Sequence, residues 1–308
     1  MTSALVVGGN GFLGSHLVDR LSADGHEVVV FDRFSTPVPR YDTAGVRAIR
    51  GDLSDTEAVR AAMRGVDEVY HFVSPTTPAT AAADPLADIR DGLPRSAALM
   101  QAAVDAEVGR LIFASSGGTI YGDQRVEAFS ERDVPEPISP YAVGKLAVEG
   151  YLRYFRRTHG LDTIALRISN PYGYRQEGAR GQGIIAIALH AVAAGRPITV
   201  FGDGSMVRDY IAVEDVAAGI AAIAGREHQH EVYNIGSGRG TSLTELLAVI
   251  ERTTGRPVIT ESAAVPPSFV RRSVLDISRI VGEFGVVPTI SLEDGVADVW
   301  RRSTQGQR

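Results

Sequence analysis

Three glycines at three-residue spacing follow the first apolar run of the chain. In ALVVGGNGFLGSHL (4–17), Gly8, Gly11 and Gly14 separate a segment with strand character from the start of a helix-like stretch. A tight turn, a close backbone approach to a phosphate, and a helix packed against its strand each need a residue without a Cβ atom. The helix N-terminus then faces the phosphates. The placement predicts a strand, turn and helix that bind the pyrophosphate of a dinucleotide, in preference to a glycine-rich turn without a ligand.

Apolar runs and helix-like stretches alternate through the first half of the sequence. The runs lie at 4–7, 27–31, 46–50, 67–73 and 110–115, and the helical patterns lie at 12–24, 55–64, near 95–106 and from about 140. This alternation predicts an α/β fold with a Rossmann-type doubly wound parallel sheet. The pattern becomes less regular after about residue 167, where we expect a smaller C-terminal substrate-binding lobe. We place a first domain at 1–167 and the lobe at 168–308, with segments near 209–236 returning to the first sheet.

The overall composition argues against several classes of function. The 308 residues carry a net charge of -6 without a long run of either sign, so neither a nucleic-acid-binding stripe nor a polybasic membrane patch is indicated. There is no cysteine and the seven histidines lack ligand spacing, so no metal site is expected. No window approaches membrane-spanning length, and the first residues carry no basic leader. We predict a cytoplasmic enzyme that binds no nucleic acid, membrane or metal.

An aspartate ends the second apolar run, EVVVFDR, eighteen residues beyond Gly14. A carboxylate at this position accepts both ribose hydroxyls of an adenosine and repels a 2′-phosphate, so Asp32 favours NAD over NADP. The neighbouring Arg33 keeps the other option open, because its guanidinium could accept a 2′-phosphate or cover the adenine. Asp52 could equally cap a helix, and Phe72 could equally be a core aromatic. The residues expected beside the cofactor from the helix start and from later strand ends are Phe12, Leu13, Asp52, Leu53, Phe72 and Val73.

A tyrosine and a lysine four residues apart lie in SPYAVGKLAVEGYL (139–152). Tyr141 and Lys145 share one face of a helix, and Ser139 and Pro140 suit its N-cap and first turn. A free tyrosine titrates near about 10 and is a poor base at neutral pH. A lysine ammonium and an oxidised nicotinamide nearby would lower the pKa of the phenol by stabilising the phenolate. Together with the glycine fingerprint, the pair predicts a proton shuttle, although a helix surface could carry this spacing by chance.

These motifs resemble the extended short-chain dehydrogenase/reductase superfamily, in particular its NAD-dependent nucleotide-sugar epimerase/dehydratase branch, typified by UDP-glucose 4-epimerase. The matching segments, in family order from residue 5 to about 218, are GGNGFLG, FDR, GDL, SSGGTIYG, SPYAVGK, RISNPYG and VRDYIAVEDVA. The resemblance implies NAD as the cofactor and a nucleotide sugar as the ligand of the lobe at 168–308. It also implies a homodimer formed through a four-helix bundle that uses the helices near 95–106 and 140–157.

The resemblance places the segment SSGGTIYG (115–122) beneath the nicotinamide and the sugar. Ser115, Ser116 and Thr119 lie where the family has a hydroxyl beside the sugar C4 oxygen, and Ser115 also borders the cofactor. The position that most members use for the catalytic Ser or Thr is Gly117 in this chain. The role then passes to Ser116, to Thr119 or to a water, and we favour Ser116. Gly117 and Gly118 let the sugar approach the end of the strand.

The same segment helps to choose among the reactions of the branch. Dehydratases and decarboxylases usually carry an acid or amide between the hydroxyl and the Tyr-Gly pair, whereas this chain has Gly118, Thr119 and Ile120. Epimerisation needs one base and a cofactor that keeps the hydride. We predict an NAD-dependent 4-epimerase of UDP-hexoses or UDP-hexuronic acids, in which Tyr141 takes the C4 proton and Lys145 stabilises the phenolate and holds the nicotinamide ribose. A 4-keto-sugar reductase of the same fold, or a non-catalytic nucleotide-binding protein, is the alternative.

Two motifs match family residues that bind the nucleotide end of the substrate. Asn170 in RISNPYG corresponds to an asparagine that contacts the diphosphate, with Ser169 near the nicotinamide or sugar. Arg208 in VRDY corresponds to an arginine that grips the diphosphate, which suits the bidentate geometry of a guanidinium. A loop asparagine or a solvated arginine would be expected without the motifs.

Two departures from the family pattern concern substrate and cofactor contacts. Upstream of Leu275-Asp276, many epimerases carry an arginine and an aspartate where this chain has Pro266 and Phe269. Arg271 or Arg272 is the expected substitute, and we assign Arg271 to the substrate site. Gly92 stands where the family often has a cofactor-binding asparagine.

Overall fold

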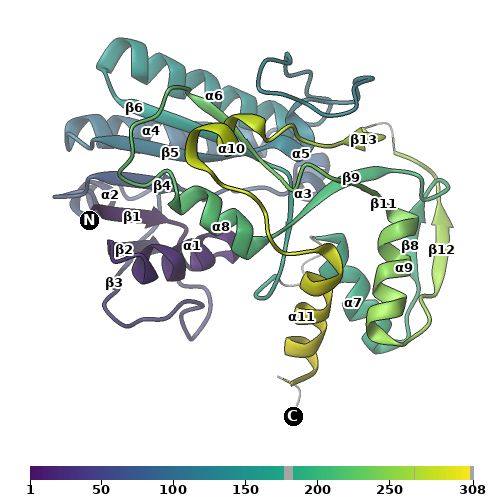
Figure 1. Cartoon of the computed structure of the whole chain (residues 1–308). Coiled ribbons are helices and arrows are strands. Elements are labelled where there is room, and N and C mark those ends of the chain that lie inside the picture. Colours follow the sequence, from purple (N-terminus) through teal and green to yellow (C-terminus); the bar gives the residue numbers. More distant parts are fainter. Residues whose placement is uncertain (177–182, 267, 306–308) are drawn as a thin grey trace.

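Seven parallel strands form the central sheet of the protein (Figure 1). The computed structural model describes residues 1–176, 183–266 and 268–305. The strand order is β10-β6-β5-β4-β1-β2-β3, so the chain winds outward from β1 in one direction and then resumes at β4 on its other side. This arrangement confirms the predicted Rossmann-type α/β fold. The strands are β1 (Ser3–Val7), β2 (Glu27–Asp32), β3 (Arg47–Arg50), β4 (Glu68–His71), β5 (Arg110–Ser116), β6 (Asp162–Ile168) and β10 (Val232–Ile235).

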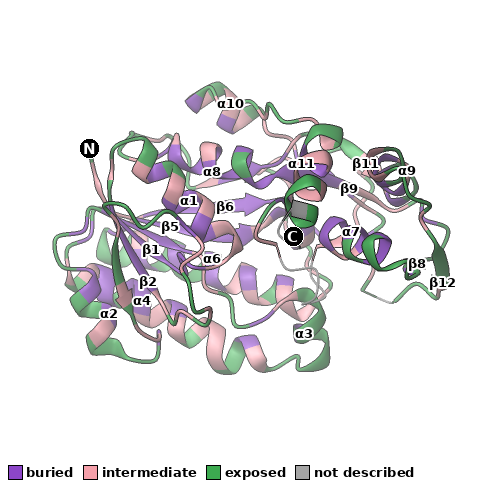
Figure 2. Ribbon diagram, turned by 90° about the horizontal axis from the view of Figure 1, so that it is seen from below, coloured by how far each residue is buried: buried purple, intermediate pink, exposed green. Residues whose placement is uncertain are grey.

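Helices cover both faces of this sheet. One face is covered by α1 (Phe12–Ala23), α8 (Val213–Ala221) and α10 (Ser278–Phe284), and the other by α2 (Thr56–Ala62), α4 (Leu93–Asp105) and α6 (Pro140–His159). The two-residue period of a strand divides the core between the faces, because β1 directs Ala4 and Val6 to the first layer and Leu5 and Val7 to the second. Figure 2 shows the buried residues concentrated along the strands and on the helix faces turned toward them.

Residues beyond β6 contribute both to the large sheet and to a second group of elements. β10 pairs with β6 at the edge of the sheet, and α8 packs beside α1. In the second group, β9 (Val207–Ala212) pairs with β7 (Asn170–Tyr172), β11 (Gly240–Ser242) and β13 (Arg272–Ser273), and β8 (Ile198–Phe201) pairs with β12 (Thr260–Ala263). The helices α7 (Ile184–Ala194), α9 (Leu243–Thr254) and α11 (Leu292–Gln305) share a core with these strands. The division at residue 167 stays a prediction.

Three short helices lie near the carboxyl ends of the strands of the large sheet. They are α3 (Pro78–Ala83), the π-helix η1 (Asp88–Gly92) and α5 (Gly117–Ile120), which directly follows β5. The sequence pattern did not predict any of the three as separate elements. Their lengths, from four to six residues, are too short to give a periodic signal.

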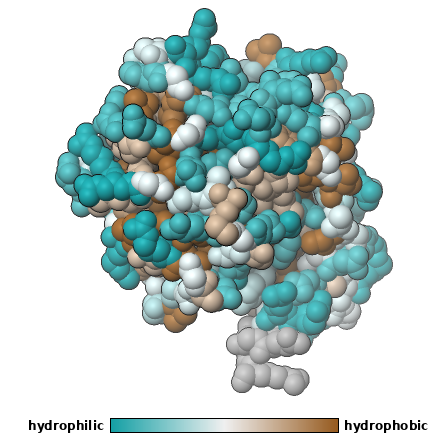
Figure 3. Space-filling view, turned by 60° about the vertical axis from the view of Figure 1, so that its left-hand side comes forward, coloured by the Kyte–Doolittle hydropathy of each residue, from teal (hydrophilic) through white to brown (hydrophobic). Residues whose placement is uncertain are grey.

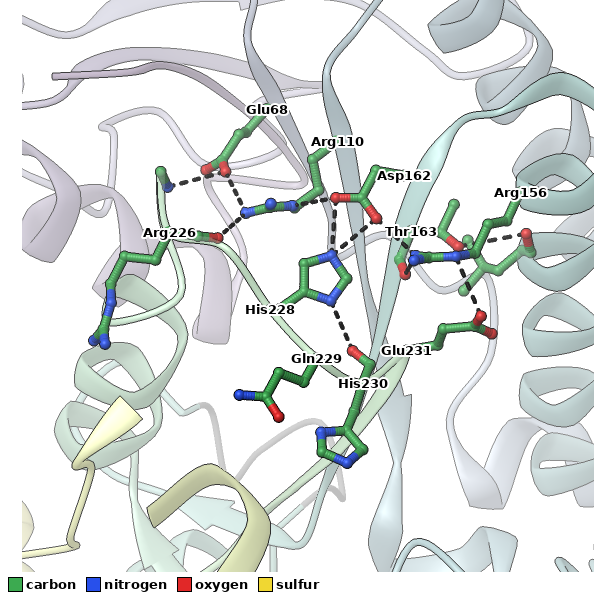
Figure 4. A network of polar contacts seen from close by, with 12 residues as sticks. Glu68, Arg110, Arg156, Asp162, Thr163, Arg226, His228, Gln229, His230 and Glu231 are labelled. Carbon is green, nitrogen blue, oxygen red and sulfur yellow. Dashed lines mark hydrogen bonds and ion pairs between the residues drawn. The ribbon is translucent and has the colours of Figure 1, made fainter. Parts of the chain in front are cut away.

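A polar network crosses the amino ends of β4, β5 and β6 (Figure 4). Arg110 donates to Glu68 at 3.1 Å and to Asp162 at 2.7 Å. The His228 ring nitrogen Nε2 lies 2.9 Å from both carboxylate oxygens of Asp162. The backbone amide of Gly225 donates to Glu68 at 3.0 Å. The network therefore anchors the segment that leads into β10 to the amino ends of the strands. Ser116 lies at the opposite end of the sheet, where it ends β5.

Within the described ranges, no helix is long and apolar enough to cross a membrane, and no group of three or more His, Asp or Glu side chains is placed to hold a metal ion. Figure 3 shows one face of the molecule, on which hydrophobic side chains gather in small patches separated by hydrophilic ones.

Candidate active site

The glycine turn between β1 and α1 has the close packing that its sequence predicts. Gly8 has a φ of +87°, and a Cβ atom there would lie 3.2 Å from the backbone nitrogen of Val73. Gly11 is the N-cap of α1, and its amide donates to the Gly8 carbonyl at 3.0 Å. A Cβ atom on Gly14 would overlap that same carbonyl oxygen. The start of α1 is therefore packed directly on the turn, as a helix N-terminus facing a phosphate requires.

Asp32 ends β2 beside this turn. Its two carboxylate oxygens accept from the backbone amides of Asn10 and Phe34, each at 3.0 Å. These bonds fix the Asp32 carboxylate next to the glycine fingerprint, although Asn10 and Asp32 are 22 positions apart in the chain. A fixed hydrogen-bond acceptor at this place suits the hydroxyls of an adenosine ribose and disfavours a phosphate.

The other residues expected near the adenosine differ in their placement. The Arg33 side chain is 75% exposed, and its nearest carboxylate contact is Asp52 at 3.9 Å. Hydrogen bonds from the backbone and side chain of Ser54 hold the pKa of Asp52 below its usual value. Leu53 packs its side chain into the core beneath α2. Any cofactor contact from Leu53 would therefore come from its backbone.

The helix α6 begins as predicted. Ser139 is its N-cap, with Oγ accepting from the Ala142 amide at 3.3 Å, and Pro140 occupies its first turn. Lys145 is buried, and its ammonium group donates to the Ala114 carbonyl of β5 at 2.9 Å. The nitrogen lies 5.6 Å from the centre of the Tyr141 ring. Burial lowers the pKa of Lys145 to about 8, while nearby carboxylates oppose the fall.

The Tyr141 phenol is protonated in this environment. Burial raises its pKa to about 12, and the negative charge of Asp88 contributes in the same direction. A hydrogen bond with the Ser116 side chain opposes the rise. Because desolvation disfavours the phenolate, the tyrosine becomes a base only when positive charge is brought close to it.

Two hydroxyls stand beside this phenol at the end of β5. Thr119 donates to the Ser116 oxygen at 2.8 Å, so Ser116 links Thr119 to Tyr141. Gly117 faces elsewhere, because a Cβ atom there would lie 2.5 Å from Leu275 and 2.8 Å from the Arg167 carbonyl oxygen. A side chain at residue 117 would meet the core and the backbone of β6 instead of Tyr141. Ser116 is therefore the hydroxyl adjoining the tyrosine.

Ser115 is engaged with a buried ion pair. Its hydroxyl donates to Glu149 at 2.6 Å, and Arg167 donates to both oxygens of the same carboxylate, at 3.1 and 2.8 Å. This network joins β5, α6 and β6 behind the Tyr141–Lys145 pair. The Ser115 hydroxyl is thus used in holding the strand, although the residue still borders the cavity described next.

A cavity of about 330 Å³ opens in front of Tyr141 and Ser116. Its volume lies at the lower end of the range for small-molecule sites. None of its described lining residues is an aspartate or glutamate. The predicted site residues that line it are Phe12, Leu13, Ser115, Ser116, Gly118, Thr119, Tyr141, Asn170 and Arg208.

Arg208 supplies positive charge to this cavity. Its guanidinium donates to the Val207 carbonyl at 2.8 Å and lies 5.8 Å from the centre of the Phe269 ring. Burial lowers its pKa, and no carboxylate in the described part of the chain forms an ion pair with it. Asn170 lies on the adjacent β7, where its side-chain amide donates to the Asp209 carbonyl at 3.4 Å. The pair can bind an anion.

Arg271 lies apart from this cavity. Its guanidinium is 66% exposed and pairs with Asp123 at 2.8 Å. Phe269, which stands where many epimerases carry an aspartate, covers one side of Arg208.

Several cavity residues were not predicted, and Tyr210 is the one that the sequence could have indicated. It follows Arg208 by two positions on β9, so both side chains lie on the same face of the strand. Its hydroxyl is buried without a hydrogen-bond partner in the described residues, and burial raises its pKa to about 12. Tyr172 lines the cavity from within the RISNPYG motif, in which only Ser169 and Asn170 were singled out. Gln176 and Met206 line it from outside the quoted motifs.

Comparison with known proteins places the chain among nucleotide-sugar enzymes. The model of the NAD dependent epimerase/dehydratase family matches residues 4–236. A UDP-glucose 4-epimerase from Mycolicibacterium smegmatis is 34% identical over 301 residues, covering 95% of this chain and 96% of that protein. The structure of a Thermotoga maritima UDP-glucose 4-epimerase with UDP-glucose superposes with a TM-score of 0.93 at 31% identity, covering 99% and 100% of the two chains. That of the Thermus thermophilus UDP-glucose 4-epimerase with NAD gives 0.89 at 33% identity, covering 97% and 98%.

Proposed function

Because the chain belongs to the NAD-dependent epimerase/dehydratase family, we propose that it is a 4-epimerase acting on a UDP-hexose or a UDP-hexuronic acid. NAD is its cofactor. The glycine turn and the Asp32 carboxylate fit the pyrophosphate and the adenosine ribose of this cofactor.

The observation that carries the choice of reaction is the absence of carboxylates from the described cavity lining. Removing water from a sugar needs an acid and a base acting at C5 and C6, in addition to the group at C4. The described lining offers Tyr141 with the hydroxyls of Ser116 and Thr119, and no aspartate or glutamate. This set supports exchange of one proton at one carbon, which is what epimerisation at C4 requires.

In the proposed reaction, Tyr141 removes the proton of the C4 hydroxyl. Ser116 and Thr119 hold the C4 oxygen through their linked hydroxyls. Lys145 stabilises the phenolate with its ammonium charge. Bound NAD⁺ would supply a positive charge near the phenol; it would take up the C4 hydride and give it back to the opposite face of C4, so that the sugar undergoes no net oxidation. Tyr141 then returns its proton after the 4-keto sugar has turned over to present its other face.

The nucleotide end of the substrate is assigned to Arg208 and Asn170. An arginine without a carboxylate partner supports binding of a diphosphate, since a charge-assisted bond is strong where water is excluded. Gly118 leaves the floor beneath the sugar without a side chain, which supports turnover of the intermediate. Arg271 is a weaker candidate, because Asp123 already balances its charge.

A 4-keto-sugar reductase of the same fold is the second candidate. The highly exposed Arg33 beside Asp32 favours it, because an arginine there could accept the 2′-phosphate of NADPH. Such an enzyme would release its oxidised cofactor after each turnover, whereas an epimerase keeps it.

We also propose that the protein is a homodimer and that two regions of each chain bind different ligands. Exposed apolar or aromatic side chains on α6, at Val143, Tyr151 and Tyr154, support a subunit contact through this helix. Residues 1–167 would bind NAD, and residues 168–308 would bind the nucleotide sugar.

Proton NMR of the anomeric region tests the reaction directly. The protein, with NAD, is incubated separately with UDP-glucose, UDP-N-acetylglucosamine and UDP-glucuronic acid. A new anomeric signal that grows to a fixed ratio in one sample identifies the substrate. Tyr141→Phe is expected to abolish this signal while the protein still binds NAD. No conversion of any of the three would contradict the proposed substrate class, and turnover by Tyr141→Phe would remove Tyr141 as the base.

A further inference from the structure

Asp88 places a carboxylate behind the Tyr141–Lys145 pair. It begins η1 and is 9% exposed. The Thr76 hydroxyl lies 2.8 Å from each of its oxygens and donates to the carboxylate. In the part of the chain that the structure describes, no other group donates a hydrogen bond to the carboxylate, and no cation reaches it at ion-pairing distance. A buried carboxylate with so little compensation is unfavourable unless positive charge lies nearby.

The carboxylate is held against α6. A Cβ atom on Gly144 would lie 2.9 Å from the Asp88 Cβ atom and 3.2 Å from its Oδ2 atom. A Cβ atom on Gly92 would lie 3.1 Å from the Oδ1 atom. Two glycines thus leave room for Asp88, one of them directly before Lys145 in the chain. A cavity of about 20 Å³ is lined by Asp88, Tyr141 and Lys145 among others, and this volume admits one water molecule.

The other titratable groups that face Lys145 do not balance its charge. Glu149, one helical turn further along α6, is bound at both oxygens by Arg167. His71 on β4 is neutral, because burial, reinforced by the Lys145 charge, lowers its pKa to about 3. Tyr141 is protonated. Among the described residues, Asp88 is therefore the carboxylate near Lys145 that is not already paired with an arginine.

Lys145 is also the only lysine in the chain, whose 31 Lys and Arg residues are otherwise all arginine. An arginine stays charged under all ordinary conditions, whereas the charge of a buried lysine depends on its surroundings. Because residue 145 is a lysine, a neighbouring carboxylate can change how much of it is protonated at a given pH.

We propose that Asp88 is the counter-ion of Lys145: its carboxylate balances the buried ammonium group across the small cavity that both side chains line. As a positioning residue, it acts on the reaction through the pair, and this part of the proposal rests on the proposed function. The Asp88 charge is the largest influence opposing the burial that lowers the pKa of Lys145, and it also raises the pKa of Tyr141. Asp88 thus keeps both protons on the pair until oxidised cofactor brings a second positive charge to the phenol.

The single lysine permits a direct test. In full-length protein labelled with ¹³C,¹⁵N-lysine, the side-chain signal belongs to Lys145 alone, and its ¹³Cε shift is followed against pH. The expected midpoint is about 8 in the wild type. Removal of the Asp88 charge in Asp88→Asn is expected to lower the midpoint by roughly one pH unit. The control is Asp91→Asn, which makes the same charge change on η1 where Asp91 pairs with Arg95 near the surface, and it should leave the midpoint unchanged.

An unchanged Lys145 midpoint in Asp88→Asn overturns the proposal. So does a wild-type midpoint below about 7, because the ammonium would then be absent at neutrality; this measurement needs no variant. Asp88→Ser removes the same charge with a smaller side chain, and agreement between the two variants separates charge from packing. The titration needs no turnover, so it decides the role of Asp88 even if no sugar is converted. Where a sugar is converted, the whole pH–rate profile of Asp88→Asn should move to lower pH, since both pKa values fall.

Discussion

A single methyl group added at Gly117 is expected to destabilise the protein without touching any hydroxyl of the cavity. In Gly117→Ala the new Cβ atom would lie 2.5 Å from the Leu275 Cδ1 atom and 2.8 Å from the Arg167 carbonyl oxygen. Leu275 is fully buried, and the carbonyl belongs to β6, so neither neighbour can withdraw freely. Overpacking of this kind costs about 1–3 kcal/mol, against which alanine in place of helical glycine regains about 0.5–1 kcal/mol. We expect a net loss of about 1–2 kcal/mol.

Urea unfolding followed by circular dichroism measures this loss, with Gly282→Ala as the matched control. Gly282 lies exposed in α10, away from the proposed subunit contact, and its ideal Cβ position has no neighbour within 4 Å. That variant should gain about 0.5–1 kcal/mol. If Gly117→Ala is instead as stable as Gly282→Ala, the Cβ atom has room and packing does not explain the glycine. A double variant with Leu275→Ala should lose less than the sum of the two single losses, because it removes one of the overlaps.

Three further changes have defined outcomes. Ser116→Ala should lower kcat by about 10²-fold with NAD binding unchanged, because it removes the hydroxyl beside the base; an unchanged kcat would assign that role elsewhere. Arg208→Ala should raise KM for the nucleotide sugar roughly 10- to 100-fold, whereas the exposed Arg271→Ala should leave it nearly unchanged, and equal effects in steady-state kinetics would refute the assignment. The hydrogen bond to Asp162 raises the pKa of His228, so its stabilising effect is fully present below about pH 6.5 and is lost as pH rises through the folded-state pKa. Urea unfolding at several pH values should therefore show the advantage of the wild type over His228→Gln shrinking with rising pH, and a constant difference would contradict this.

Features that depend on a single turn or helix could be predicted from the sequence. Gly8 and Gly14 meet within one strand–turn–helix unit, and the contact between them follows from their spacing. Tyr141 and Lys145 share a helical face because four residues span about one turn. The parallel sheet followed from the alternation of strands and helices, but the strand order did not, because it depends on contacts between distant segments.

Features that depend on tertiary contacts were not accessible in this way. Asp88 reaches α6 only because η1 folds back beside it, and in the sequence DIRDG it is indistinguishable from a solvated helix residue. Leu53 follows a motif aspartate, yet its side chain joins the core. Arg271 pairs with Asp123, which lies 148 residues earlier in the chain. In each case the sequence specified the residue type, and the fold decided which group it would meet.

The amino and carboxyl ends of the central strands differ in how many of the nearby buried polar groups have hydrogen-bond or ion-pair partners. At the amino ends, Arg110 and Asp162 belong to a network whose charges balance one another. At the carboxyl ends, the hydroxyl of Ser169, which follows β6, is buried without a partner. On the neighbouring β9, the described residues leave the Tyr210 hydroxyl without a partner and Arg208 without a carboxylate. Buried polar groups without partners cost stability. A ligand that hydrogen-bonds to them recovers this cost, so polar groups left unpaired at only one end of the strands favour ligand binding at that end. This difference supports the proposed substrate site in front of Tyr141 independently of any motif.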